Sequence, residues 1–170
     1  MHVYLHCRWY MLRALSQKFP NPVNETSSRI VAAGVVLLCG MYIVTLSNWV
    51  LFFLIYGFAA RVVAGPTYSP LALFVTKVIT PSLRMQHRYT PGPPKRFAQL
   101  IGLLVSSSAG ILELTGHNQG ALIAICVLVV AATLEAGLGV CLGCVMFKQL
   151  MRLNLIPEKI CLECADISRK

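Results

Sequence analysis

Four long apolar runs constrain this chain more than any other feature, because each is close to the length needed to cross a lipid bilayer. The runs are Ile30–Leu46, Trp49–Gly65, Phe97–Thr115 and Gly120 to about Phe147. A helix needs about 20 residues to span about 30 Å of hydrocarbon. Hydrophobic residues make up 56% of the 170 positions and charged residues only 12%. The sequence therefore predicts an all-α integral membrane protein with four transmembrane helices, in preference to a soluble domain with four buried segments.

Two shorter helices are expected outside these spans. The segment Pro70–Thr80 carries apolar residues on one helical face and is too short to cross, which predicts an interfacial helix between spans two and three. Pro157 and Glu158 suit the first turn of a short cytoplasmic helix at the C-terminus. The fourth transmembrane helix is expected to continue beyond the bilayer to about Leu153.

The positive charges predict how the helices are oriented. Apart from Arg61, every Lys and Arg lies before the first span, in the loop 66–96 or after the fourth span. The short turns at Ser47–Asn48 and Gly116–Gln119 carry none. The positive-inside rule then places both termini and the middle loop in the cytoplasm. Charges that flank membrane spans explain the net charge of +9 without a nucleic-acid-binding module, so no nucleic acid is expected as a partner.

Three parts of the chain follow from these features: a cytoplasmic N-terminal segment at 1–29, a four-span membrane domain at 30–155 and a cytoplasmic C-terminal segment at 156–170. No secretory signal is recognisable before the first run, so the first span is expected to act as the insertion signal. Asn24-Glu25-Thr26 fits a glycosylation pattern, but in the cytoplasm it is better interpreted as the start of a helix. The Pro-Gly-Pro-Pro sequence at 91–94 is expected to exclude helix before Phe97.

Three charged residues, Arg61, Glu113 and Glu135, fall inside the apolar runs. A charge at bilayer depth costs at least about 2.5–3.5 kcal/mol on insertion scales. Arg61 and Glu135 are expected at a similar depth in the cytoplasmic half, where they can pair. This pair is interpreted either as a structural lock or as part of a proton or ion relay, unless Arg61 extends to the inner headgroups. Glu113 lies near the outer face beside His117 and is expected to be solvated.

Two similar motifs, CLGC at Cys141–Cys144 and CLEC at Cys161–Cys164, are the strongest chemical signal. Residues i and i+3 share a helical face, and the short connection between the motifs allows the four thiols to converge. The C-x2-C-x16-C-x2-C spacing fits a four-cysteine zinc site, and tetrahedral sulfur suits iron equally well. Two dithiols that exchange electrons are the alternative in a reducing cytoplasm. Simple packing of small side chains is the third interpretation.

Four short segments are informative when they are taken together. They are RFAQLIG at Arg96–Gly102, SPLA at Ser69–Ala72, GVCLGC at Gly139–Cys144 and CLEC at Cys161–Cys164. Together they resemble a bacterial family of small membrane proteins catalogued as domain of unknown function 4395. The resemblance covers about Val23 to Cys164. It implies a four-span bundle in a prokaryotic cytoplasmic membrane and an association with thioredoxin-like and sulfurtransferase proteins. No activity established for the family comes with it.

Two classes of function follow. The first is a multi-pass inner-membrane protein whose cytoplasmic four-cysteine site works in thiol-disulfide redox or sulfur transfer. Cys141 and Cys144 are then the membrane-proximal pair, and Cys161 and Cys164 exchange with a thioredoxin-like or sulfurtransferase partner.

The second class is a non-catalytic accessory or structural subunit of a larger membrane complex, in which the four cysteines hold a structural zinc or iron. A transporter finds less support, because only Glu135, Arg61 and the serines of the third span offer a polar path. No nucleophile elbow, metalloprotease motif, P-loop or dinucleotide fingerprint is present, so an ordinary hydrolase or nucleotide-driven pump is not supported.

Overall fold

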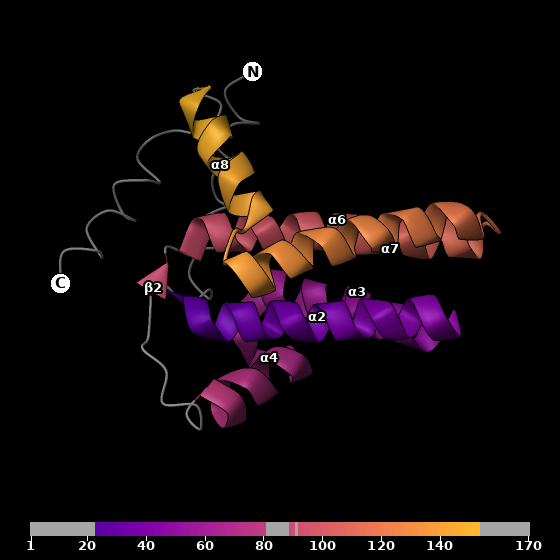
Figure 1. Cartoon of the computed structure of the whole chain (residues 1–170), viewed down its shortest axis with the longest axis horizontal. Coiled ribbons are helices and arrows are strands. Elements are labelled where there is room, and N and C mark those ends of the chain that lie inside the picture. Colours follow the sequence, from indigo (N-terminus) through magenta and orange to yellow (C-terminus); the bar gives the residue numbers. More distant parts are fainter. Residues whose placement is uncertain (1–22, 81–88, 91, 154–170) are drawn as a thin grey trace, which may run out of the picture.

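Four long helices dominate the computed structural model, which describes residues 23–80, 89–90 and 92–153. They are α2 (Glu25–Thr45), α3 (Asn48–Ala64), α6 (Gly92–Leu114) and α7 (Asn118–Thr133). The four run side by side (Figure 1). Each belongs to a helical stretch that is long and apolar enough to cross a membrane. The predicted helical fold with four membrane-spanning candidates is therefore confirmed.

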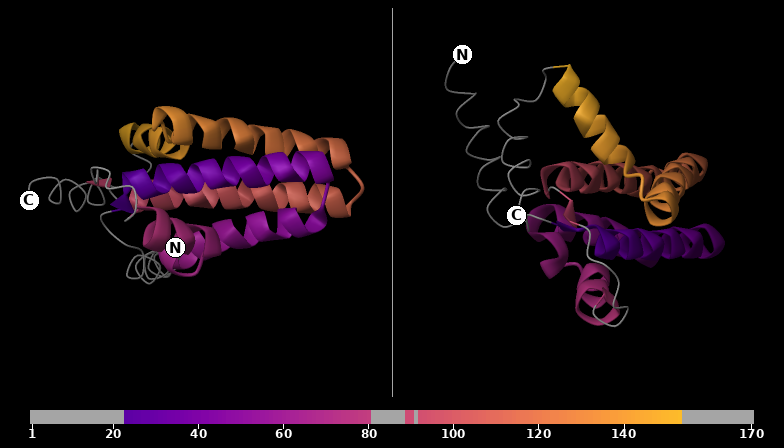
Figure 2. Two further views of the ribbon diagram at one scale, coloured as in Figure 1. Left: turned by 60° about the horizontal axis from the view of Figure 1, so that its bottom comes forward. Right: turned by 60° about the vertical axis from the view of Figure 1, so that its left-hand side comes forward.

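The four helices close into a ring. Helix α2 packs against α3 and α7, and α6 packs against the same two helices from the other side. Short turns join α2 to α3 and α6 to α7 at one end of the bundle, called here the turn end (Figure 2). The opposite end, where α8 begins, is called the cysteine end. The most deeply buried core side chains are Cys39, Tyr42, Leu54, Ala109, Ala121 and Ile125.

Large apolar side chains cover the outside of the bundle as well as its core. Leu37, Val44, Phe52, Leu104 and Ile123 are all more than half exposed. In water such a surface would drive aggregation. Apolar helices with lipid-facing side chains of this kind are what contact with a bilayer requires.

The first helix begins at Glu25, five residues before the apolar run that starts at Ile30. Asn24 is its N-cap, because the Asn24 side chain accepts a hydrogen bond from the Thr26 amide at 3.0 Å. The predicted helix start at Asn24-Glu25-Thr26 is confirmed. Immediately before the helix, the two-residue strand β1 (Val23–Asn24) pairs antiparallel with β2 (Tyr89–Thr90). Hydropathy alone places the start at Ile30, because this first turn of the helix is polar.

The third long helix begins at Gly92, although the prolines were expected to exclude helix before Phe97. Pro93 and Pro94 lie in the first turn of α6, where a backbone N–H has no intrahelical partner to lose. That prediction was wrong for this reason. As a consequence Lys95 is part of α6, and it is buried.

The chain between α3 and α6 forms the predicted short helix. It consists of a 3-10 turn, η1 (Gly65–Thr67), then α4 (Pro70–Phe74) and a π-helical turn, η2 (Val75–Ile79). Figure 1 shows α4 beside α2, at the cysteine end. Ala72 and Val75 are buried against Val31 of α2. The segment is therefore packed onto the bundle.

The fourth helix does not continue to Leu153 as predicted. Helix α7 passes into a π-helical turn, η3 (Leu134–Leu138), which ends at Gly139 with a φ of 70°. Few residues other than glycine adopt this left-handed conformation readily. The chain then resumes as α8 (Leu142–Arg152), which leaves the bundle at a steep angle (Figure 1).

Helix α8 lies very close to the start of α6. A Cβ atom added to Gly143 would be 2.5 Å from both the Cα and the Cβ of Ala98. One turn further along, the rings of Phe97 and Phe147 are in contact, with their centroids 5.6 Å apart. The glycine of the CLGC motif therefore lets the two backbones approach. The second motif, Cys161–Cys164, and its expected helix lie outside the described residues, as do residues 1–22.

The close approach predicts a steric penalty at Gly143. We expect Gly143→Ala to destabilise the protein by about 1–3 kcal/mol, because the added methyl group meets the backbone of α6. The matched control is Gly40→Ala in α2, where an added Cβ meets nothing within 4 Å. The measurement is the thermal unfolding midpoint of detergent-purified protein. Equal midpoints for the two variants would contradict the close contact.

Candidate dithiol site at the end of the bundle

Cys141 and Cys144 lie at the start of α8. Cys141 is the N-cap residue, and its carbonyl accepts the first helical hydrogen bond from the Val145 amide at 3.1 Å. Cys144 is one turn further, on the same side of the helix. Cys141 is buried and Cys144 is partly exposed. The sequence predicted that the two thiols share a helical face, but it placed them at the end of the fourth helix and not at the beginning of a new one.

This position favours a thiolate at Cys141. The amides of the first helical turn have no intrahelical acceptor, and their partial positive charge stabilises an anionic sulfur. The pKa of Cys141 is lowered, mainly by a hydrogen bond from the Cys144 thiol and further by the positive charge of Lys95. Burial and the negative charge of Glu135 oppose this shift. The pKa of Cys144 is raised by the same hydrogen bond and by burial, so Cys141 is the more acidic thiol of the pair.

A closed triangle of polar contacts lies beside the two thiols. The Nζ of Lys95 is 2.7 Å from Oε1 of Glu135, and both groups are largely buried. Lys95 Nζ also donates to the Ser28 hydroxyl at 3.0 Å, and that hydroxyl donates to the same carboxylate oxygen at 2.8 Å. Each member comes from a different element: α6, η3 and α2. Charge-assisted bonds of this kind are the strong ones in a buried setting.

Sequence reasoning missed Lys95, because it was counted among the charges of a cytoplasmic loop. A signal was present in the spacing of α6. Lys95, Gly102, Ser106 and Ala109 are all buried, and they recur at the interval of one helical face. Extending that face back from the third span through the two prolines would have placed Lys95 toward the bundle interior.

Arg61 does not form the predicted ion pair with Glu135, because Lys95 occupies that position. Arg61 is only 5% exposed. Its guanidinium lies over the ring of Phe58, 4.4 Å from the centroid. Its Nε and Nη1 have no hydrogen-bond partner among the residues that the structure describes. Glu135 is near enough for a longer-range electrostatic attraction only.

Glu113 is at the turn end, far from the thiols, and it is not simply solvated as predicted. The hydroxyl of Tyr42 donates to Oε2 of Glu113 at 2.8 Å, and Tyr42 is itself fully buried. The adjacent His117 contacts Thr115 instead, at 3.2 Å. Glu113 therefore satisfies a buried phenol between α2 and α6, which is a structural role.

Arg29 stabilises the end of η3, where the helix stops before α8 begins. Its Nε and Nη2 donate to the Ala136 carbonyl, both at 3.2 Å, and Nη2 donates to the Gly137 carbonyl at 2.6 Å. These carbonyls lie in the last turn before Gly139, where a cation is favourable. No sequence pattern indicates this role, since Arg29 is one of several positive charges that flank the spans.

The described residues do not form a metal centre by themselves. Within 23–80 and 92–153, no group of three or more His, Cys, Asp or Glu side chains is close enough to hold a metal ion. Cys141 and Cys144 alone supply two of the four ligands of a tetrahedral site. The other two predicted ligands, Cys161 and Cys164, lie outside the described residues. A four-cysteine zinc or iron site therefore stays a prediction.

A model of a known protein family matches most of the chain. The model of the family described as domain of unknown function (DUF4395) matches residues 23–152, which include the whole bundle and the CLGC motif. No curated protein matches the chain, and neither does any solved structure. The matched region covers most of the 170 residues. The chain therefore belongs to the DUF4395 family.

Proposed function

We propose that this protein is a small multi-pass protein of a prokaryotic inner membrane that carries out thiol-disulfide exchange, or transfer of sulfur, at Cys141 and Cys144. The observation that carries the proposal is the placement of the CxxC pair. Cys141 is the N-cap residue of a helix, its pKa is lowered, and the pKa of Cys144 one turn away is raised. A nucleophilic thiolate with a resolving thiol beside it is what disulfide exchange needs.

The exchange has two balanced steps. The Cys141 thiolate attacks one sulfur of an oxidised Cys161–Cys164 pair, so that a disulfide joins the two motifs and the other sulfur of that pair leaves as a thiolate. Cys144 then loses its proton to that thiolate and attacks Sγ of Cys141. A Cys141–Cys144 disulfide forms, and the second motif is released as one thiol and one thiolate. Two electrons pass to the second motif, which can then reduce a disulfide of a soluble partner.

Lys95 and Glu135 are positioning residues in this scheme. Lys95 attracts the Cys141 thiolate, and Glu135 repels it. The charge of Lys95 therefore lowers the Cys141 pKa, and the charge of Glu135 raises it. The ammonium group is also anchored by Ser28, so its charge stays at a fixed distance from the sulfur.

The second CxxC motif completes the proposed relay. Cys161 and Cys164 exchange with a soluble thioredoxin-like or sulfurtransferase partner and pass the disulfide to or from Cys141 and Cys144. The charge distribution supports a cytoplasmic location for both motifs, because Lys and Arg flank the cysteine end of the spans and are absent from the turn end. The segment Pro70–Ile79 then lies at the inner membrane surface.

The opposing charges predict pKa changes of opposite sign at Cys141. We expect Lys95→Gln to raise the Cys141 pKa, because an attractive charge is lost, and Glu135→Gln to lower it, because a repulsive charge is lost. The measurement is the pH dependence of alkylation by iodoacetamide, in protein whose other five cysteines are serine. The reaction midpoint should rise in the first variant and fall in the second. Midpoints that move together, or not at all, would contradict the proposed electrostatics.

The relay predicts which cysteine captures a soluble partner. We expect Cys161→Ser to abolish the mixed disulfide formed with a thioredoxin-like protein whose resolving cysteine is replaced. Cys126→Ser is the control, since Cys126 is exposed on a membrane-spanning helix. The measurement is non-reducing gel electrophoresis after acid trapping. Capture that survives Cys161→Ser would overturn the order of the relay. One zinc or iron per chain, lost in both Cys141→Ser and Cys161→Ser, would favour the accessory-subunit hypothesis instead.

The proposed orientation predicts the outcome of reporter fusions. Alkaline phosphatase fused after Lys170 should be inactive in cells, and a fluorescent protein at the same position should fluoresce, because both report a cytoplasmic C-terminus. A phosphatase inserted in the turn at Ser47–Asn48 should be active. The opposite pattern would place the cysteines in an oxidising compartment and remove the basis for a reduced dithiol.

A further inference from the structure

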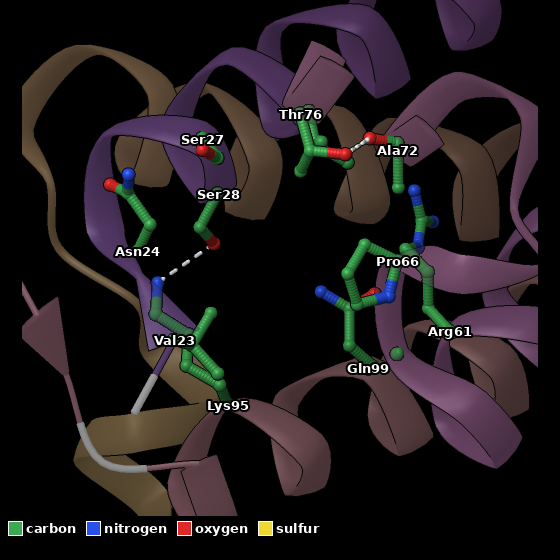
Figure 3. Close-up of a pocket in the computed structure, with 12 residues that line it drawn as sticks. Val23, Asn24, Ser27, Ser28, Arg61, Pro66, Ala72, Thr76, Lys95 and Gln99 are labelled. Atoms are coloured by element: carbon green, nitrogen blue, oxygen red, sulfur yellow. Dashed lines mark hydrogen bonds between the residues drawn. The ribbon is translucent and has the colours of Figure 1, made fainter. Parts of the chain in front are cut away.

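A cavity of about 170 Å³ lies at the cysteine end of the bundle. Its walls come from the start of α2, the end of α3, the α4 segment and the first turns of α6 (Figure 3). This volume is well above the roughly 10–15 Å³ that a cavity needs in order to hold one water molecule. Polar groups on its lining include Arg61, Lys95, Gln99 and Ser28, and its apolar walls include Val31 and Ala72. The cavity is therefore large enough for a small ligand group.

Two of the lining side chains have unsatisfied polar atoms. Arg61 is buried, and its Nε and Nη1 have no hydrogen-bond partner within the described parts of the chain. The Oε1 of Gln99 is also buried without a partner there. An unpaired buried polar group destabilises the fold, and more so when it is charged, so native structures rarely leave one. In Figure 3 both side chains border the same hollow.

The charges around the cavity do not balance. Arg61 and Lys95 are the charged residues of the lining, and both are cations. Lys95 is neutralised by its ion pair with Glu135, so the Glu135 carboxylate is not available to Arg61 as a contact partner. Arg61 therefore needs a counter-ion that the described residues do not supply. A guanidinium binds carboxylate and phosphate oxygens well, because its planar donors match their geometry.

We propose that this cavity binds a single anionic group, a carboxylate or a phosphate, on a short apolar stem, with Arg61 as its counter-ion. Nε and Nη1 of Arg61 donate to the anion. Gln99 lines the same cavity and can add only the N–H groups of its amide, because its Oε1 is an acceptor. The apolar walls accept the first carbons of the stem. The anion comes either from a small soluble molecule or from the headgroup of an anionic lipid, since both present the same chemistry to Arg61.

The test is a thermal-shift titration of the full chain in a neutral detergent at constant ionic strength. Three probes are used: butyrate, inorganic phosphate, and phosphatidylglycerol in mixed micelles. Butyramide and phosphatidylcholine serve as uncharged or net-neutral controls. A saturable rise in the unfolding midpoint with butyrate or phosphate indicates a soluble anion, and one seen with phosphatidylglycerol alone indicates a lipid headgroup. No saturable rise with any of the three would overturn the proposal, and so would an equal rise with the controls.

Variants locate the binding. Arg61→Gln removes the counter-ion, and Gln99→Glu places a carboxylate of the chain's own in the cavity. We expect each substitution to raise the anion concentration needed for half-saturation about ten-fold or more. Because Gln99→Glu is isosteric and offers Arg61 a partner, it should keep or raise the midpoint without ligand, which separates lost binding from lost folding. Arg152→Gln is the matched control, since Arg152 is exposed in the last turn of α8. Unchanged binding in Arg61→Gln would overturn the proposal.

The anion site is independent of the proposed redox function. Arg61 and Gln99 contact neither thiol, so Cys141→Ser should bind the probe as the native chain does. Loss of binding in Cys141→Ser would overturn the assignment to the Arg61 cavity.

Discussion

A carboxylate buried near the end of an apolar bundle needs a cation, and Glu135 obtains one from Lys95. An unpaired charge at this depth would destabilise the fold by several kcal/mol, so the contact constrains every element that contributes to it. Lys95 lies in the first turn of α6, Glu135 lies in the π-helical turn η3, and Ser28 lies at the start of α2. The polar triangle thus joins three helices that are distant in sequence at the end of the bundle where the thiols lie.

The break after α7 depends on the same region. Gly139 takes a left-handed conformation that ends the helix, and Arg29 satisfies the carbonyls exposed just before it. Gly143 then allows α8 to cross against Ala98 of α6. Without the break, Cys141 would lie within a continuous helix and its sulfur would have no unbonded amides beside it. The break therefore changes the chemistry of the CLGC motif as well as the path of the chain.

Lys95 links the dithiol and the cavity. Its ammonium group lines the cavity, pairs with Glu135 and attracts the Cys141 thiolate. One cation therefore faces both the site proposed for redox chemistry and the site proposed for an anion. The two sites depend on different residues, because the redox site needs Cys141 and the anion site needs Arg61.

Local patterns in the sequence were sufficient for the four apolar helices, the helix start at Asn24-Glu25-Thr26 and the short helix from Pro70, because chain length, hydropathy and turn chemistry act over a few residues. They were also sufficient to show that Cys141 and Cys144 share a helical face. The partner of Glu135 depended on the tertiary structure, since the sequence pointed to Arg61 and helix packing brings Lys95 to the carboxylate instead. The same holds for the break at Gly139, where the π-helical turn and Arg29 end a helix that hydropathy alone would have continued. Interactions between elements far apart in the chain decided the site, because they depend on which helices meet.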